Sequence, residues 1–141
     1  MNDNHYQQNL YMKINLTITG CMGRMGQQLI KSSNKNKIFK IVSLTENFKI
    51  NKKIHNILPE FNNVSSFKKT NIIIDFTVPK CTLEVLKIAS KLKKRVVIGT
   101  TGFTKNQEIL IKKYSKKIPI LKAGNMSLGI NLLMYLTEIT S

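Results

Sequence analysis

The stretch TITGCMGRMGQQLI, Thr17 to Ile30, joins an apolar run to a helical pattern through three glycines, Gly20, Gly23 and Gly26. Glycines at the start of a helix let an anion approach free backbone N–H groups without a Cβ in the way, and the positive end of the helix dipole favours phosphate. The spacing is GxxGxxG rather than the common GxGxxG, so Met22 occupies the place of the second glycine and Gly23 is expected to take over its role. The motif alone fits a tight strand-to-helix turn almost as well as a phosphate-binding loop.

Strand and helix patterns alternate along the rest of the chain. Strands are expected over residues 13–19, 39–45, 71–77, 95–99 and 118–122, and helices over about 23–34, 79–93, 104–117 and 127–140. Pro79 suits the first turn of its helix, and Thr104 with Gln107 forms a capping box. Pro119 marks the last strand as an edge or entry position. Residues 46–70 are rich in Lys, Asn and Ser and are expected to form a loop with at most a short helix.

This alternation predicts an α/β fold, a doubly wound parallel sheet with right-handed crossovers and helices on both faces. Ligands of such sheets bind beyond the carboxyl ends of the strands. Small or polar residues follow each expected strand at that end, namely GCMGRMG, Glu46, DFT, GTTG and AGNMS. We therefore expect these segments to converge on one rim of the sheet.

Glu46 ends the second expected strand, 20 residues after Gly26. An acidic side chain at that place accepts hydrogen bonds from the adenosine ribose hydroxyls of a dinucleotide. The chain has only 7 Asp and Glu residues, so an acid here favours a dinucleotide site over a solvated loop carboxylate. A carboxylate also favours NAD over NADP because it repels a 2′-phosphate, while Lys49 and Arg24 supply positive charge that keeps NADP as an alternative.

Two further strand ends carry polar residues. The GTTG loop, Gly99 to Gly102, offers backbone groups for a nicotinamide amide, with Thr101 facing the reacting centre; ordinary turn chemistry is the alternative for Thr100 and Thr101. Asp75 is expected to cap the next helix or to face solvent rather than to act as a base. Neither a Ser/His/Asp set, a Cys/His set nor a carboxylate pair can be assembled, so hydride chemistry would rest on a bound cofactor.

The composition limits the class of protein and its partners. The net charge is +16, but 21 of the 23 basic residues are Lys spread over all expected elements, which indicates compositional bias rather than a nucleic-acid surface. No stretch approaches the roughly 20 apolar residues that span a bilayer, so we expect a soluble, cytoplasmic protein with no membrane or nucleic-acid partner. Cys21, Cys81, His5 and His55 lack metal-ligand spacing, which predicts neither a disulfide nor a metal site.

From Lys13 to about Asn131 the chain resembles the N-terminal half of the 4-hydroxy-tetrahydrodipicolinate reductase (dihydrodipicolinate reductase) family. The resemblance is carried by five pieces in the order and spacing of that family, namely GCMGRMG, Glu46, IDFTVP, GTTGF and GNMSLGIN. The resemblance implies a Rossmann-like dinucleotide-binding domain over residues 13–126. It also implies, over 127–141, the start of a helix that leads to a substrate domain outside this chain. Residues 1–12 carry no apolar periodicity and are expected to form a disordered leader.

The cofactor implied by the resemblance is NADH or NADPH. Its implied contacts are Gly20, Cys21, Met22, Gly23, Arg24, Met25, Glu46, Gly99, Thr100, Thr101, Ala123, Gly124, Asn125 and Met126. Asn47 stands where many family members have an arginine for the 2′-phosphate of NADPH, which argues against efficient use of NADPH.

The implied reaction belongs to lysine and diaminopimelate biosynthesis. Hydride would pass to the ring carbon left electrophilic when 4-hydroxy-tetrahydrodipicolinate loses water, with Thr101 facing this small dicarboxylate substrate. The family's His-His-x-x-Lys proton-donor motif and Ser-Gly-Thr anion loop would follow Ser141, so no catalytic residue is expected within the chain, and the family homotetramer is built through that later domain. A non-catalytic NAD-binding fragment and a basic nucleic-acid-binding protein are the alternatives.

Overall fold

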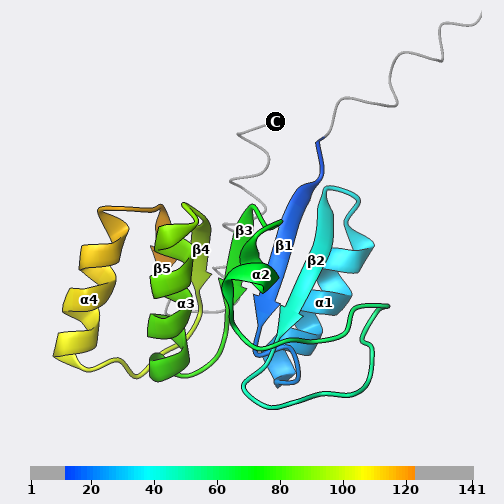
Figure 1. Ribbon diagram of the computed structural model, residues 1–141, viewed down its shortest axis with the longest axis horizontal. Coiled ribbons are helices and arrows are strands. Elements are labelled where there is room, and N and C mark those ends of the chain that lie inside the picture. Colours follow the sequence, from blue (N-terminus) through cyan, green and yellow to red (C-terminus); the bar gives the residue numbers. More distant parts are fainter. Residues whose placement is uncertain (1–11, 123–141) are drawn as a thin grey trace, which may run out of the picture.

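The structure, a computed structural model, describes residues 12–122 of the 141-residue chain. Its centre is an all-parallel sheet of five strands in the order β2-β1-β3-β4-β5 (Figure 1). The strands are β1 (Ile14–Thr19), β2 (Phe39–Thr45), β3 (Ile72–Asp75), β4 (Arg95–Ile98) and β5 (Ile120–Lys122). The helices are α1 (Arg24–Lys35), α2 (Val64–Phe67), α3 (Pro79–Lys91) and α4 (Lys105–Ser115). The predicted doubly wound α/β sheet is confirmed.

The predicted elements within this range are present, with ends shifted by at most two residues. The capping box at the start of α4 is formed, since Thr104 accepts a hydrogen bond from the Gln107 N–H at 3.3 Å and the Gln107 side chain accepts one from the Thr104 N–H at 2.9 Å. Pro79 occupies the first turn of α3. The helix predicted over 127–140 and the leader lie outside the described residues.

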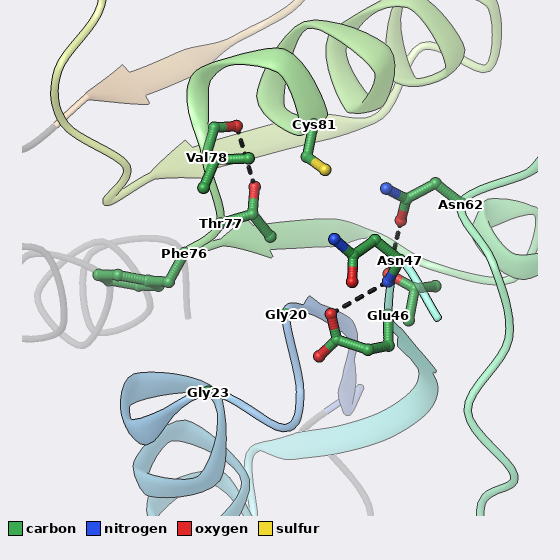
Figure 2. Close-up of a pocket in the computed structure, with 10 residues that line it drawn as sticks. Gly20, Gly23, Glu46, Asn47, Asn62, Phe76, Thr77, Val78 and Cys81 are labelled. Atoms are coloured by element: carbon green, nitrogen blue, oxygen red, sulfur yellow. Dashed lines mark hydrogen bonds between the residues drawn. The ribbon is translucent and has the colours of Figure 1, made fainter. Parts of the chain in front are cut away.

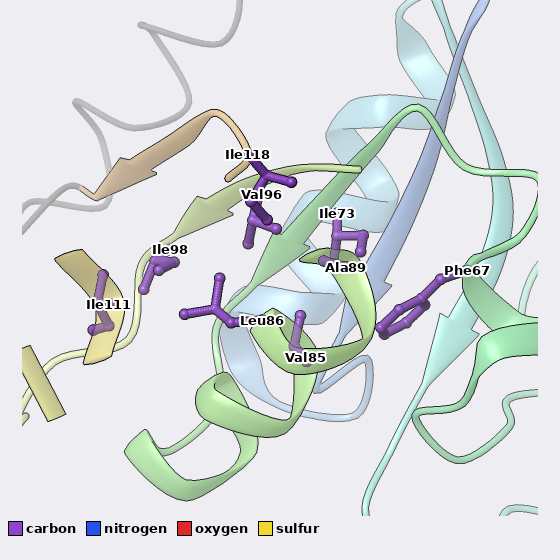
Figure 3. Packing of buried hydrophobic residues seen from close by; sticks show 9 residues of the cluster. All are labelled: Phe67, Ile73, Val85, Leu86, Ala89, Val96, Ile98, Ile111 and Ile118. Atoms are coloured by element: carbon purple, nitrogen blue, oxygen red, sulfur yellow. The ribbon is translucent and has the colours of Figure 1, made fainter. Parts of the chain in front are cut away.

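Each face of the sheet carries its own apolar core, because side chains alternate along a strand. On one face Leu16, Ile18, Leu44, Ile74 and Val97 pack with Leu29 and Ile30 of α1. On the other face, Ile73, Val96 and Ile98 lie beside Val85, Leu86 and Ala89 of α3 (Figure 3). The run Ile72 to Ile74 therefore belongs to a strand covered on both faces, as its composition predicts.

The glycines after β1 are required by close backbone contacts. Gly20 has φ +67°, and a Cβ on it would lie 2.7 Å from the Phe76 carbonyl oxygen. A Cβ on Gly26 would lie 2.1 Å from the Gly20 carbonyl oxygen and 2.8 Å from the Cys21 Cα. The Cys21 N–H donates to the Thr45 carbonyl at 3.2 Å, so the loop is also tied to the end of β2.

Replacing Gly26 by Ala is expected to lower the free energy of unfolding by roughly 1–3 kcal/mol, the usual cost of overpacking. The added methyl meets backbone atoms that move only if α1 shifts as a whole, which outweighs the roughly 0.5–1 kcal/mol that Ala gains over Gly within a helix. Urea unfolding measures the effect. Gln28→Ala, at an exposed position of the same helix, is the control and is expected to change stability by no more than about 0.5 kcal/mol. Equal stability of G26A and the wild type would contradict this account of the loop.

Candidate functional site

A pocket opens at the carboxyl ends of the parallel strands. Its lining residues are Gly20, Gly23, Thr45, Glu46, Asn47, Asn62, Phe76, Thr77, Val78 and Cys81 (Figure 2). Figure 2 shows the glycine loop on one side, Thr77, Val78 and Cys81 on the other, and Glu46 with Asn47 between them. The rim predicted from the strand ends is therefore where the pocket lies.

Glu46 is held against the glycine loop. One carboxylate oxygen, Oε2, accepts the Met22 N–H at 3.1 Å, and the other, Oε1, accepts the Asn47 N–H at 3.0 Å. Its backbone N–H donates to the Glu60 carbonyl at 2.9 Å, which fixes the end of β2. An ionised carboxylate can accept about four hydrogen bonds. Since these two N–H groups are its partners among the described residues, Glu46 keeps acceptor capacity for further donors in the pocket.

The β3–α3 connection packs between the glycine loop and the GTTG loop. The Phe76 ring lies so close to Gly99 that a Cβ there would be 1.9 Å from the ring, and the Phe76 carbonyl lies against Gly20. The Thr77 N–H donates to the Thr100 hydroxyl at 2.9 Å. These contacts give three chain segments, far apart in sequence, a fixed arrangement around the pocket.

Asp75 is completely buried and does not face solvent, and the N-cap of α3 is Val78 with no side-chain cap hydrogen bond, so both alternatives expected for Asp75 are wrong. Its carboxylate accepts hydrogen bonds from the hydroxyls of Thr19 at 2.5 Å, Thr77 at 2.8 Å, Thr82 at 2.5 Å and Thr100 at 3.0 Å. Side chains alternate between the two faces of β3, so Asp75 lies on the same face as Ile73. Because α3 covers that face, the carboxylate is buried. A buried charge needs such partners.

The structure distributes the predicted site residues over three environments. Gly20, Gly23 and Glu46 line the pocket; Cys21, Gly99 and Thr100 are buried around it; Met22, Arg24 and Thr101 are exposed and Met25 is half-buried. Ala123 to Met126 lie outside the described residues. The structure therefore brings the glycine loop and Glu46 together at one pocket.

Sequence reasoning missed several lining residues. Phe76 and Thr77 lie in the DFT segment that the strand-end rule places on this rim, and Val78 follows it, but the predicted cofactor contacts include none of the three. Cys81 sits on the first turn of α3, where nothing in the local sequence marks it. Asn62 comes from an irregular loop and accepts the Thr45 hydroxyl at 2.6 Å. Its place in the pocket depends on that long-range contact.

Burial controls the chemistry of both cysteines. It raises the pKa of the Cys21 thiol to about 11, with a smaller contribution from the negative charge of Glu46. Burial also raises the pKa of the Cys81 thiol, and the charges of Glu84, Asp75 and Glu46 add to the effect. Both side chains are consequently neutral thiols near pH 7.

Two negative observations apply to residues 12–122. In that range no cluster of at least three His, Cys, Asp or Glu side chains is arranged to hold a metal ion. No helix in the same range has the length and apolar character needed to cross a membrane.

The parallel sheet, the glycine loop and the strand-end pocket define a Rossmann-type α/β domain. The sequence model described as "Dihydrodipicolinate reductase, N-terminus" matches residues 14–126. The chain belongs to the dihydrodipicolinate reductase family.

Individual relatives agree with this assignment. The 4-hydroxy-tetrahydrodipicolinate reductase of Pelagibacter ubique is 73% identical over 129 residues, covering 92% of this chain and 50% of that protein. The enzyme of the same name from Buchnera aphidicola subsp. Cinara cedri is 39% identical over 133 residues, covering 86% of this chain and 49% of that protein. The chain thus spans about half the length of these relatives.

Solved structures with a similar fold also match only part of their own length to this chain. A dipicolinate-bound dihydrodipicolinate reductase from a Paenisporosarcina species aligns with a TM-score of 0.66 at 26% identity, covering 91% of this chain and 53% of that chain. A homoserine dehydrogenase of S. aureus aligns with a TM-score of 0.59 at 20% identity, covering 79% of this chain and 32% of that chain, and shares the fold alone.

Alkylation distinguishes the two thiols. Iodoacetamide at pH 8 is expected to modify Cys81 well before Cys21, because Cys81 is partly exposed in the pocket while Cys21 is fully buried. With a pKa of about 11, roughly one Cys21 side chain in a thousand is ionised at that pH. Mass spectrometry of peptides follows both sites, and Cys81→Ser is expected to remove the fast phase. Modification of Cys21 at the rate of Cys81 would contradict the burial described here.

Proposed function

We propose that the chain is the cofactor-binding part of a 4-hydroxy-tetrahydrodipicolinate reductase and that its pocket holds NADH. The observation that carries the proposal is the carboxylate of Glu46, held on the Met22 N–H of the glycine loop and lining the same pocket as Gly20 and Gly23. This arrangement offers a ribose acceptor beside a phosphate-binding turn.

The glycine loop fits a pyrophosphate. Gly20 and Gly23 line the pocket without side chains of their own, and the space that a Cβ on Gly20 would need is filled by the Phe76 backbone and the Thr77 side chain. No side chain caps α1 at Gly23, and its first turn contains no acidic residue. The helix start therefore keeps free N–H groups and a positive dipole end for a phosphate. By contrast, the start of α4 is closed by the capping box of Thr104.

The adenosine end of the pocket favours NADH over NADPH. Among the lining residues contributed by the described part of the chain, Glu46 is the charged one, and neither Lys nor Arg belongs to that set. A 2′-phosphate would meet this carboxylate with no lining cation from residues 12–122 beside it. Asn47, directly after Glu46, is neutral. A ribose that carries free hydroxyls would instead donate to Glu46.

The nicotinamide end is assigned by resemblance to Gly99, Thr100 and Thr101, followed by the segment from Ala123 to Met126. In support, the Thr100 hydroxyl is fixed by the Thr77 N–H at 2.9 Å, while Thr101 is exposed beside it. An exposed hydroxyl next to a fixed backbone loop suits contact with a substrate. Cys21, Met22, Arg24 and Met25 complete the proposed pyrophosphate side.

NADH, when bound, supplies the hydride that reduces the dehydrated form of 4-hydroxy-tetrahydrodipicolinate, a small dicarboxylate. The chain's own residues bind and orient the cofactor over residues 13–126. The proton donor and the substrate-binding groups other than Thr101 are assigned to the half of the enzyme that this chain does not span. We further propose that the protein acts in the cytoplasm, as a soluble enzyme of lysine and diaminopimelate biosynthesis.

A fluorescence titration of the 141-residue chain tests the proposal. NADH is expected to bind saturably, and NADPH at least about tenfold more weakly, because its 2′-phosphate faces Glu46. Glu46→Gln is expected to weaken NADH binding by about tenfold, since the ribose loses a charged acceptor, and to narrow the difference between the two cofactors.

The matched control is Glu60→Gln, which makes the same change of charge at an exposed side chain near β2 and is expected to leave both affinities within about twofold. No saturable NADH binding would reject the dinucleotide function. Unchanged NADH affinity in E46Q would reject the ribose contact.

A further inference from the structure

The buried carboxylate of Asp75 joins the segment that the proposed function assigns to the pyrophosphate of the cofactor with the segment that it assigns to the nicotinamide. Asp75 ends the central strand β3 and is opposite Thr19 in the β1–β3 register. Thr19 directly precedes Gly20 of the glycine loop, and Thr100 belongs to the GTTG loop. Both threonine hydroxyls donate to this one carboxylate, at 2.5 Å and 3.0 Å.

We propose that Asp75 is a positioning residue that sets the spacing between the glycine loop and the GTTG loop, and so lets the ADP-ribose part and the nicotinamide of a dinucleotide bind at once. This inference rests on the proposed function of the pocket.

Both oxygens of the Asp75 carboxylate accept hydrogen bonds, and each accepts from a different pair of hydroxyls. Oδ1 accepts the hydroxyls of Thr19 and Thr77, while Oδ2 accepts those of Thr82 and Thr100. An amide at this position has one oxygen and one NH₂ group. Asp75→Asn would therefore leave one pair of hydroxyls facing a donor, and either the β1 side or the GTTG side would lose its acceptor.

The GTTG side is tied to Asp75 by more than one contact. The Gly99 N–H donates to the Asp75 carbonyl at 2.8 Å. The Thr100 hydroxyl accepts the Thr77 N–H, so its own proton is free to donate to the Asp75 carboxylate. The Phe76 segment fills the space between the two loops, as the close approaches at Gly20 and Gly99 show. A change in the Asp75 contacts therefore moves the loops relative to each other.

The chain offers a matched pair of variants that separates positioning from stability. Thr19 and Thr82 are both fully buried, and each hydroxyl lies 2.5 Å from the Asp75 carboxylate. Thr19 leads into the glycine loop, whereas Thr82 belongs to α3 and is not a lining residue of the pocket. Replacement by valine keeps the shape and removes one hydroxyl in each case.

The experiment measures affinities of the 141-residue chain for NADH and for ADP-ribose, which lacks the nicotinamide. The wild type is expected to bind NADH more tightly than ADP-ribose. Asp75→Asn and Thr19→Val are expected to lower this ratio by about tenfold, equivalent to one lost hydrogen bond to a charged group, with ADP-ribose affinity nearly unchanged. Thr82→Val is expected to lower the melting temperature as Thr19→Val does and to keep the wild-type ratio.

Each other outcome overturns a specific statement. Three outcomes would overturn the positioning role while leaving a dinucleotide site intact. The first is a ratio of NADH to ADP-ribose affinity that falls equally in T19V and T82V. The others are equal losses of affinity for both ligands in D75N, and wild-type NADH binding that is no tighter than ADP-ribose binding. Absence of binding of either ligand to the wild type would overturn the proposed function itself. If D75N does not fold, the comparison of T19V with T82V decides the question.

Discussion

The hydrogen bonds of the buried Asp75 carboxylate constrain the segments at the carboxyl ends of the strands. Removing an ionised carboxylate from water costs several kcal/mol unless partners replace the water. Asp75 finds its partners in four threonine hydroxyls. They come from β1, the β3–α3 connection, α3 and the GTTG loop, so satisfying the carboxylate brings these segments to fixed positions. The glycine loop, which lines the pocket, and the GTTG loop, which lies behind the Phe76 segment, are thereby held at a fixed spacing.

The charge of the pocket differs in sign from the charge of the chain. The chain carries +16 in total, yet the charged lining residue within the described range is the acid Glu46. The many lysines supply a general attraction for anionic ligands. In the proposed function, the Glu46 carboxylate accepts ribose hydroxyls and repels a phosphate on the same ribose. The proposal thus assigns general attraction to the lysines and selection between cofactors to Glu46.

The sequence predicted the features that depend on local patterns. Strands, helices, the capping box at Thr104 and the place of Glu46 all follow from periodicity and short spacings, and the structure has them within the residues it describes. It did not predict the burial of Asp75, which depends on hydroxyls between 2 and 56 positions away. Nor did it predict the place of Asn62, which depends on its bond to Thr45 across 17 positions and on the backbone bonds of Glu60 to the end of β2. Contacts between residues far apart in the sequence cannot be predicted from such local patterns.

A crystal structure of the chain with NADH bound would test the assignment of the pocket. We expect the adenosine ribose hydroxyls within hydrogen-bonding distance of the Glu46 carboxylate, the pyrophosphate against the backbone of Gly20 to Gly23, and the Asp75 carboxylate still bonded to Thr19 and Thr100. A nucleotide bound away from this pocket, or one whose ribose does not contact Glu46, would contradict this assignment.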